Sequence, residues 1–392
     1  MDPNELGEGR LIQPDTQHSY RLQTRLGGGL TSQVYLAVNE ADAKDRIAVK
    51  IARPALDPRL TASFKSEADL LMRLAQAERN RTRYFPRVIF FKNDYYAQGG
   101  KWLLLGLELV TAPSLADCVW RERKMFARER IAVQAGLEYA RMLTLLHNTG
   151  TTCADRKLKD IHWDNAANEG QQLRVLDWNV TAQATTQTLQ FDLFRFGLLW
   201  YQLLLETEPQ VVKSDETTLV ITRPSGAIQE KWEQLSEGIR HIIETTLHPN
   251  LKLRYPSAQT LQQSLQEHWE RWQKTPDELV RVARNASNPG AGDFYAVDLA
   301  KRRHELLGEP LSEKFDDLYA RLYELVKGQW DKLADRVRDA LTGGDSKIEP
   351  DALALFLQDE TALAASDPAM ALRLKRYSIM LEARQAAEDT SG

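Results

Sequence analysis

The chain has 392 residues, of which 43% are hydrophobic and 27% charged, a composition typical of a soluble globular protein with two or three domains. Its 51 Lys and Arg residues are balanced by 55 Asp and Glu residues, and this balance argues against a nucleic-acid-binding protein. The only two cysteines, Cys118 and Cys153, support neither a disulfide framework nor a structural zinc site, and they favour a reducing, cytoplasmic location.

Membrane association is not expected from the hydropathy pattern. The N-terminus lacks the basic flank and apolar run of a secretory signal. The longest apolar stretches, Trp102 to Leu109 and Phe196 to Leu205, are about half the roughly 20 residues that cross a bilayer. We therefore interpret both stretches as buried core segments.

The N-terminal part of the chain has mainly strand patterns. Residues 1–19 are predicted to form an extension and residues 20–110 a small β-rich lobe. One helix is predicted between residues 62 and 74, where apolar side chains follow helical spacing. Strands are predicted at residues 20–26, 34–38, 47–51 and 102–110.

The pattern becomes helical after Ser114, and residues 111–274 are predicted to form a large α-rich lobe. Helices are predicted at residues 131–147, 191–206, 235–246 and 257–272, with short strands near residue 161 and at 173–176. A domain boundary is predicted near Lys274, because Thr275 to Glu278 supplies an N-cap, a proline at the first helical position and acids in the first turn.

A separate all-α module is predicted over residues 275–387, followed by a disordered tail at 388–392. Its clearest helix is predicted from Ser312 to Leu341, and two more after Pro350 and Pro368. These amphipathic helices contain no catalytic constellation, so we expect them to recruit a protein partner or substrate. The alternative is that they complete the fold of the large lobe.

Two features near the N-terminus are suited to phosphate chemistry. The glycines Gly27, Gly28 and Gly29 precede a predicted strand that contains Val34, and backbone N–H groups without side chains around them can approach a phosphate. Alone, such a triplet more often makes a simple hairpin.

The second feature is a lysine on a predicted strand, in Ala48-Val49-Lys50, followed 17 residues later by Glu67 on the predicted helix. A buried strand rarely tolerates an unpaired ammonium group, so we predict that Lys50 pairs with Glu67. Taken singly, either residue could instead lie on a solvated surface.

With these residues the chain resembles the bacterial serine/threonine protein kinase family, as a divergent member, and the later motifs follow in the family's order. Glu108-Leu109-Val110 looks like the family's hinge, with Leu107 at the gatekeeper position. The resemblance implies that ATP binds here, its adenine received by backbone groups of Glu108 and Val110. It also assigns the three glycines, Val34, Ala48 and Lys50 to the nucleotide site.

The segment from His147 to Ile161 resembles the family's catalytic loop. Asp155 falls on the catalytic aspartate, Lys157 on the lysine two residues later, and Asp160 on a metal-binding asparagine. The residues Asp177-Trp178-Asn179 look like the metal-binding D-F-G turn. The resemblance implies that Asp160 and Asp177 hold Mg²⁺ or Mn²⁺, and that Lys50 and Glu67 belong to the catalytic set.

Two later segments, at residues 191–201 and 248–258, also resemble parts of kinase domains, so the similarity spans about residues 20–272. It implies an α+β, two-lobed protein kinase-like fold, with a small β-rich N-lobe and a large α-rich C-lobe, followed by the C-terminal all-α module.

Three features depart from the family pattern. Cys153-Ala154 replaces His-Arg before the catalytic aspartate, so control by activation-loop phosphorylation is not expected. Ser32 replaces the third loop glycine. Asp192 follows only 15 positions after Asp177, which leaves little chain for a peptide-docking platform.

The function expected from the resemblance is ATP-dependent phosphate transfer to a Ser/Thr hydroxyl. The expectation rests on five side chains that are able to hold phosphates, a divalent cation and a nucleophile: Lys50, Glu67, Asp155, Asp160 and Asp177. One alternative is a pseudokinase scaffold that binds partners through the helical module. Another is a small-molecule kinase, which needs no peptide platform. Magnesium-dependent ATP turnover, and the identity of its acceptor, would distinguish the three.

Overall fold

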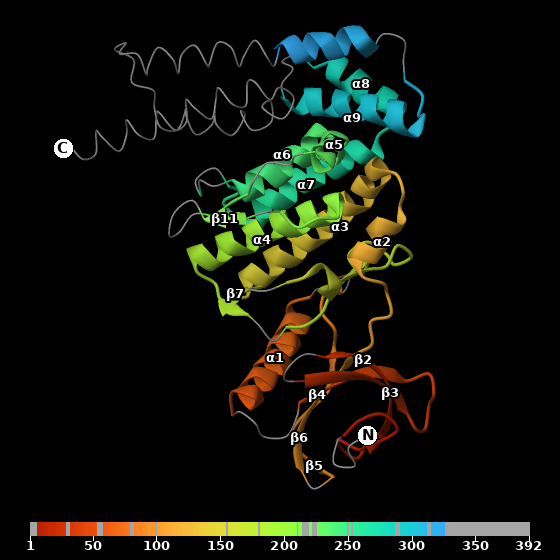
Figure 1. The fold of residues 1–392 in the computed structure, drawn as a ribbon, viewed down its shortest axis with the longest axis vertical. Helices are drawn as coiled ribbons and strands as arrows, with labels where there is room; N and C mark the ends of the chain where they lie inside the picture. The colour runs from red at the N-terminus through yellow and green to blue at the C-terminus, as the bar shows by residue number, and fades with distance from the viewer. Residues whose placement is uncertain are drawn as a thin grey trace, which may run out of the picture. The chain divides into compact units, whose positions relative to one another are not determined.

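The structure is a computed structural model with an α+β architecture: a curled antiparallel sheet in its N-terminal part and helices in its C-terminal part (Figure 1). The chain divides into two compact units, a first unit of Met1–Cys118 with Met142–Thr188, and a second unit of Val119–Arg141 with Leu189–Gly392. The described residues are 6–28, 32–52, 58–78, 82–98, 100–153, 156–178, 181–209, 211–213, 219–221, 226–248, 251, 254–286, 291–311 and 315–325.

The sheet of the first unit has six strands in the order β1-β2-β3-β4-β6-β5, and each neighbouring pair is antiparallel. The strands are β1 (Leu11–Ile12), β2 (Tyr20–Gly28), β3 (Ser32–Asn39), β4 (Arg46–Ala52), β5 (Val88–Ala97) and β6 (Gly100–Glu108). The four predicted strands are confirmed as β2, β3, β4 and β6. Strands β1 and β5 were not predicted.

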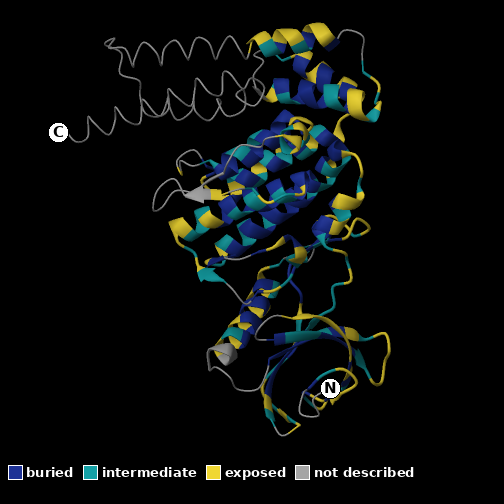
Figure 2. Cartoon of the chain, in the orientation of Figure 1, coloured by how far each residue is buried: buried dark blue, intermediate teal, exposed yellow. Residues whose placement is uncertain are grey.

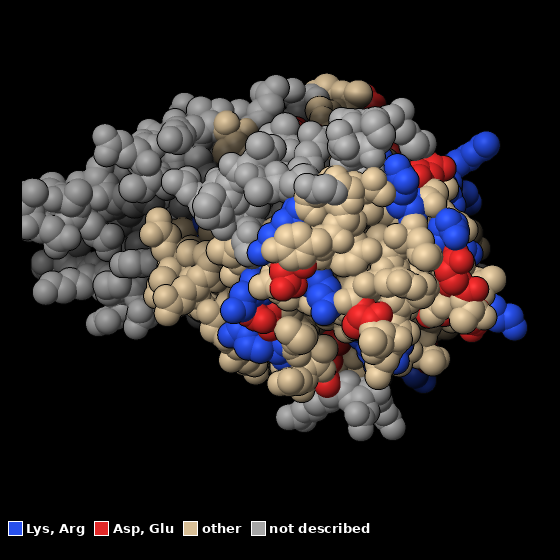
Figure 3. Space-filling model, turned by 90° about the horizontal axis from the view of Figure 1, so that it is seen from below, with Lys and Arg blue, Asp and Glu red and all other residues tan. Residues whose placement is uncertain are grey.

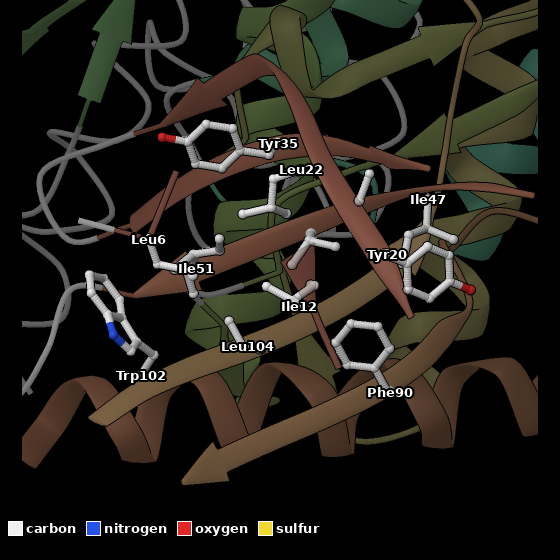
Figure 4. Packing of buried hydrophobic residues seen from close by; sticks show 12 residues of the cluster. Leu6, Ile12, Tyr20, Leu22, Tyr35, Ile47, Ile51, Phe90, Trp102 and Leu104 are labelled. Carbon is white, nitrogen blue, oxygen red and sulfur yellow. The ribbon is translucent and has the colours of Figure 1, made fainter. Parts of the chain in front are cut away.

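The two faces of the sheet have different roles because successive side chains of a strand point to opposite faces. The inner face of the curl encloses an apolar core (Figure 4), to which β4 contributes Ile47, Val49 and Ile51. The remaining members are Leu6, Ile12, Tyr20, Leu22, Tyr35, Ala37, Phe90, Trp102 and Leu104. Ala48 and Lys50 therefore lie on the other face.

Helix α1 (Pro58–Ala77) covers part of that second face. Its residues Phe64 and Ala68 pack with Ala52, Leu103 and Leu105 of the sheet in a second apolar cluster. The helix contains the predicted segment 62–74 and extends it at both ends. This packing fixes the position of α1 on the sheet and the rotation of the helix about its own axis. It thereby sets where the neighbouring residues of α1 contact the sheet.

Short elements complete the first unit. The strands β8 (Ile161–Trp163) and β9 (Leu173–Val175) form an antiparallel pair, as do β7 (Thr151–Thr152) and β10 (Ala182–Gln183). A single 3₁₀ turn, η1 (Leu158–Asp160), precedes β8 directly. The β8–β9 pair brings the predicted catalytic loop beside the predicted metal-binding turn, because one lies just before β8 and the other just after β9.

The second unit is mainly helical, and its helices turn buried faces toward one another (Figure 2). The elements are α2 (Leu115–Arg121), α3 (Met125–Asn148), α4 (Thr186–Leu205), β11 (Val211–Lys213), β12 (Leu219–Ile221), α5 (Ala227–Glu233), α6 (Glu237–Leu247), α7 (Ala258–Gln273), α8 (Pro276–Arg284) and α9 (Ala291–Leu307). Three helices, α2, α3 and α4, begin in one unit and continue into the other, and one small strand pair belongs to the second unit. The four helices predicted in the large lobe correspond to α3, α4, α6 and α7.

Helix α8 begins where the sequence predicts it. The Thr275 hydroxyl accepts a hydrogen bond from the backbone N–H of Glu278 at 3.3 Å, in a capping box with Pro276 at the first helical position. The second unit nevertheless continues through the predicted boundary at Lys274, because α9 packs against α6 and α7 as well as α8.

Part of the predicted C-terminal module is described. Residues 315–325 are helical, in agreement with the start of the helix predicted from Ser312. The rest of that helix, the helices predicted after Pro350 and Pro368, and the tail at 388–392 lie outside the described residues. None of the helices that the structure describes combines the length and the apolar composition needed to cross a bilayer.

Candidate functional site

The outer face of the sheet gathers the predicted nucleotide-binding residues by strand register. Gly27 is paired with Val34, Val34 with Lys50, and Ala48 with Leu107 across neighbouring strands. Directly opposed residues share a face of the sheet, so these side chains lie side by side. Val34, Ala48 and Leu107 are each half-buried. They form an apolar patch beside a buried ammonium group, a surface that an aromatic ring can cover.

The ammonium group belongs to a buried ion pair between β4 and α1. Lys50 Nζ lies 2.7 Å from Glu67 Oε2, and the two residues are only 6% and 2% exposed. The ring of Phe64 also lies near the ammonium, with Nζ 5.4 Å from its centroid. The predicted pairing is confirmed, and it explains how a lysine can occupy a covered strand without the cost of an uncompensated charge.

The turn after β9 joins this pair. Lys50 Nζ lies 3.4 Å from Asp177 Oδ1, and the backbone N–H of Trp178 donates to Glu67 Oε1 at 3.1 Å. Glu67 therefore holds the lysine with one oxygen and the turn with the other. The Asp177 side chain remains 49% exposed, so its carboxylate is open to a ligand.

Asp160 lies beside Asp177 at the end of η1. Burial raises the pKa of Asp160, and the negative charge of Asp177 raises it further. The backbone N–H of Leu176 donates to the Asp160 carbonyl at 2.8 Å, which ties the two segments together. The two carboxyl groups predicted to bind metal are thus close enough to repel each other. A divalent cation, which prefers carboxylate oxygens, would relieve this repulsion.

Other predicted residues have less defined places. Asp155 and Gly29 lie outside the described residues. Lys157 is exposed, and its backbone N–H donates to Asp160 Oδ2 at 3.1 Å. Gly28 ends β2, where a Cβ would lie 2.9 Å from the Ser32 carbonyl oxygen, so only glycine fits without a shift. Among the residues that the structure describes, no group of three or more His, Cys, Asp or Glu side chains is gathered as metal ligands.

The predicted hinge lies at the end of β6. Glu108 is the last residue of that strand, and its backbone N–H donates to the Arg87 carbonyl at 2.8 Å. Val110, two residues later, is half-buried. The backbone then continues into α2, and Leu107 of the apolar patch directly precedes Glu108 in the chain.

Sequence reasoning missed Arg156, which follows the predicted catalytic aspartate. Its guanidinium lies over the ring of Trp178, with Cζ 4.0 Å from the ring centroid, and is almost completely buried. An arginine beside one motif and a tryptophan in place of phenylalanine in the next is a combination that permits stacking. The tryptophan in place of phenylalanine is the one part of this contact that the sequence signalled, since nothing in the spacing points to Arg156.

A separate groove of about 860 Å³ borders α1 in the first unit. None of the predicted site residues lines this groove. Helix α1 supplies part of the lining and also carries Glu67, so it borders both the Lys50 site and the groove. Its lining comes from Ser66, Asp69, Leu70, Met72, Arg73 and Gln76 of α1 and from residues 149–151 and 181–183.

The distribution of surface charge agrees with the balanced composition. On the face drawn in Figure 3, Lys and Arg side chains are interspersed with Asp and Glu. Comparison with known proteins adds no family: no protein-family model matches this sequence, and the search of curated proteins gives no significant match.

Proposed function

We propose that this chain is an ATP-dependent phosphotransferase with a protein kinase-like fold, acting on a hydroxyl group. The observation that carries the proposal is the convergence of Lys50, Glu67 and Asp177 from three separate elements: β4, α1 and the turn after β9. Lys50 contacts the buried carboxylate of Glu67 and the solvent-exposed carboxylate of Asp177. Such an arrangement is suited to holding the phosphates of a nucleotide next to a cation site.

The residues of the site divide the work. Lys50, held by Glu67, would pair with phosphate oxygens, and the backbone near Gly27 and Gly28 would approach them. The apolar patch of Val34, Ala48 and Leu107 would receive the adenine next to the hinge. The oxygens of Asp160 and Asp177 fit Mg²⁺ or Mn²⁺, which when bound would offset the negative charge of the transferred phosphate.

The resemblance assigns the remaining chemistry to the catalytic loop. Asp155 would accept the proton of the attacking hydroxyl, and Lys157 would stabilise the charge that develops on the phosphate. The aspartate that replaces the family's asparagine, Asp160, keeps an oxygen ligand and adds negative charge, which strengthens the case for a divalent cation.

One observation bears on the acceptor. Helix α4 starts at Thr186, only nine positions after Asp177, and the link between them contains β10, which is paired to β7. This short link leaves little chain to support a bound peptide. A small-molecule hydroxyl is therefore a second candidate acceptor, beside a Ser/Thr hydroxyl of a protein.

The test is phosphate transfer from labelled ATP by the full-length chain, with Mg²⁺ and with Mn²⁺, resolved by mass into transfer to itself, to added protein and to metabolites. Asp177→Asn should reduce transfer by at least about 100-fold without unfolding the protein. The matched control is Asp164→Asn, which makes the same change at an exposed position outside the site. Nucleotide binding without transfer would identify a pseudokinase scaffold instead, and undiminished transfer by Asp177→Asn would contradict the proposal.

A further inference from the structure

Arg156 is a buried cation that the proposed reaction does not use directly. The residue is 1% exposed, although a guanidinium stays charged at any physiological pH. Its Nη1 donates to the Leu176 carbonyl at 2.9 Å and also to the Asp177 carbonyl. Its planar group stacks on the Trp178 ring at 4.0 Å. Thus one side chain contacts three consecutive residues of the turn that carries Asp177.

The rest of this turn is also fastened by hydrogen bonds. The N–H of Val175 donates to the Tyr84 carbonyl at 2.9 Å, and the Trp178 indole donates to the Val175 carbonyl at 2.8 Å. The ring of Trp178 meets the Phe85 ring edge to face, with centroids 4.9 Å apart. These contacts hold the two ends of the turn. The carbonyls of its middle residues, Leu176 and Asp177, are held by Arg156.

The middle of the turn needs such support because of its backbone. Asp177 has a φ of +62°, a left-handed conformation that is uncommon for residues other than glycine, although aspartate tolerates it better than most. A released turn could relax to a more common conformation and carry the Asp177 carboxylate away from Lys50. The two carbonyl bonds from one guanidinium oppose that relaxation.

We propose that Arg156 is a positioning residue, whose guanidinium fixes the turn so that the Asp177 carboxylate faces Lys50 and Asp160. The role of Asp177 in this statement rests on the proposed phosphotransferase function. Lysine cannot replace the arginine fully, because its ammonium lacks both a planar face and a fork of donors. Leucine would remove the donor that both carbonyls share.

The experiment uses the full-length chain labelled with 5-fluorotryptophan, with the Trp178 resonance assigned by its loss in Trp178→Phe. Arg156→Leu and Arg156→Lys are compared with Lys159→Gln, which removes a positive charge from an exposed position of the same loop. Fluorine NMR reports the surroundings of Trp178 whether or not the protein transfers phosphate. Phosphate transfer is measured in parallel at saturating and limiting ATP.

Both Arg156 variants should shift or split the Trp178 resonance and lower kcat by about 10- to 100-fold, while KM for ATP changes less than about threefold. Lys159→Gln should change neither. If Arg156→Leu is insoluble, Arg156→Lys decides. An unmoved resonance, or a moved resonance with unchanged kcat, overturns the positioning role. If the unaltered chain transfers no phosphate, the proposed function fails. Splitting of the Trp178 resonance, which reports more than one conformation of the turn, then decides whether Arg156 holds it.

Discussion

Each of the two units buries a network of charged side chains, and the networks differ in where their charges are directed. In the second unit, the fully buried carboxylate of Glu129 accepts the N–H of Ser236 at 2.8 Å and its hydroxyl at 2.5 Å. Asp298 of α9 accepts the N–H of Glu237 at 3.1 Å. Both carboxylates thus satisfy the N-terminus of α6, where N–H groups lack helical partners.

In the first unit, the buried carboxylate of Glu67 supports a site open to solvent. Asp177 is half exposed and lies next to Asp160, so negative charge accumulates where a ligand can reach it. The comparison teaches that burial of charge does not by itself indicate function. Under the proposed function, the distinguishing feature is repulsion between like charges at an accessible position, which a bound cation would relieve.

The strongest way to break the network of the second unit is to remove residues from Thr275 onward. This deletion removes Asp298 and the side chains of Leu279, Val280 and Phe294, which are at most 2% exposed. Each buried apolar side chain contributes about 1.5–3 kcal/mol, and a whole domain has only about 5–15 kcal/mol of stability. We expect the shortened chain to lose cooperative unfolding of the second unit, measured by circular dichroism melting.

The matched control is a chain that ends after residue 325, which keeps α8 and α9. It should melt cooperatively. The contacts of α8 and α9 favour the interpretation that these helices complete the fold of the large lobe. If the chain ending at Lys274 melts as the control does, that interpretation is wrong, and recruitment of a partner becomes the better explanation for the helices.

In the first unit, Lys50→Met tests whether the ion pair is needed to keep Glu67 buried. The variant leaves a carboxylate that is 2% exposed without its cation, which should lower the free energy of unfolding by about 3–5 kcal/mol in urea titrations. Adding Glu67→Gln should recover part of that loss, because it removes the buried charge.

The control for this variant is Arg21→Met, which breaks the exposed ion pair between Arg21 and Glu40 at 2.7 Å. An exposed pair contributes at most about 1 kcal/mol. Equal losses of stability in Lys50→Met and Arg21→Met would mean that the buried pair has no special role in the first unit.

The smallest expected effect is the pH dependence of Mn²⁺ binding, which sharpens the contrast between the units. The pKa of Asp160 is raised above its ordinary value of 3.8, so this carboxyl takes up a proton at a higher pH than a free aspartate. Because a metal needs the ionised form, Mn²⁺ affinity should fall as the pH is lowered through the raised pKa, by up to about tenfold per pH unit. Water-proton relaxation measures this affinity, and Asp160→Asn should bind more weakly with a shallower pH profile. An unchanged profile in that variant would exclude Asp160 as the titrating ligand.

The local features of the first unit were predictable from sequence. Alternation identified β2, and runs of apolar, strand-favouring residues identified β3, β4 and β6. The cost of an unpaired buried ammonium predicted the pairing of Lys50 with Glu67. Strand β5 escaped prediction because its sequence breaks the alternation with Lys92, Asn93 and Asp94, where the register with β6 also shifts.

Contacts between distant segments were not predictable in the same way. The stacking of Arg156 on Trp178 depends on two loops that the β8–β9 pair brings together, and neither residue signals the other by spacing. At Lys274 the capping signals correctly indicated the start of a helix. Whether a new domain also starts there depends on nonlocal bonds, such as that from Arg303 to the Trp272 carbonyl at 3.2 Å.

The two oxygens of Glu67 have a consequence for motion. Because Oε2 binds Lys50 and Oε1 accepts the N–H of Trp178, α1 cannot leave the sheet without releasing the lysine and the turn at the same moment. Docking of the helix and ordering of the turn therefore share one free energy of opening. The backbone amide of Trp178 therefore reports on that opening. Its rate of hydrogen exchange with solvent measures how often α1 leaves the sheet, although the residues of α1 lie more than 100 positions earlier in the chain.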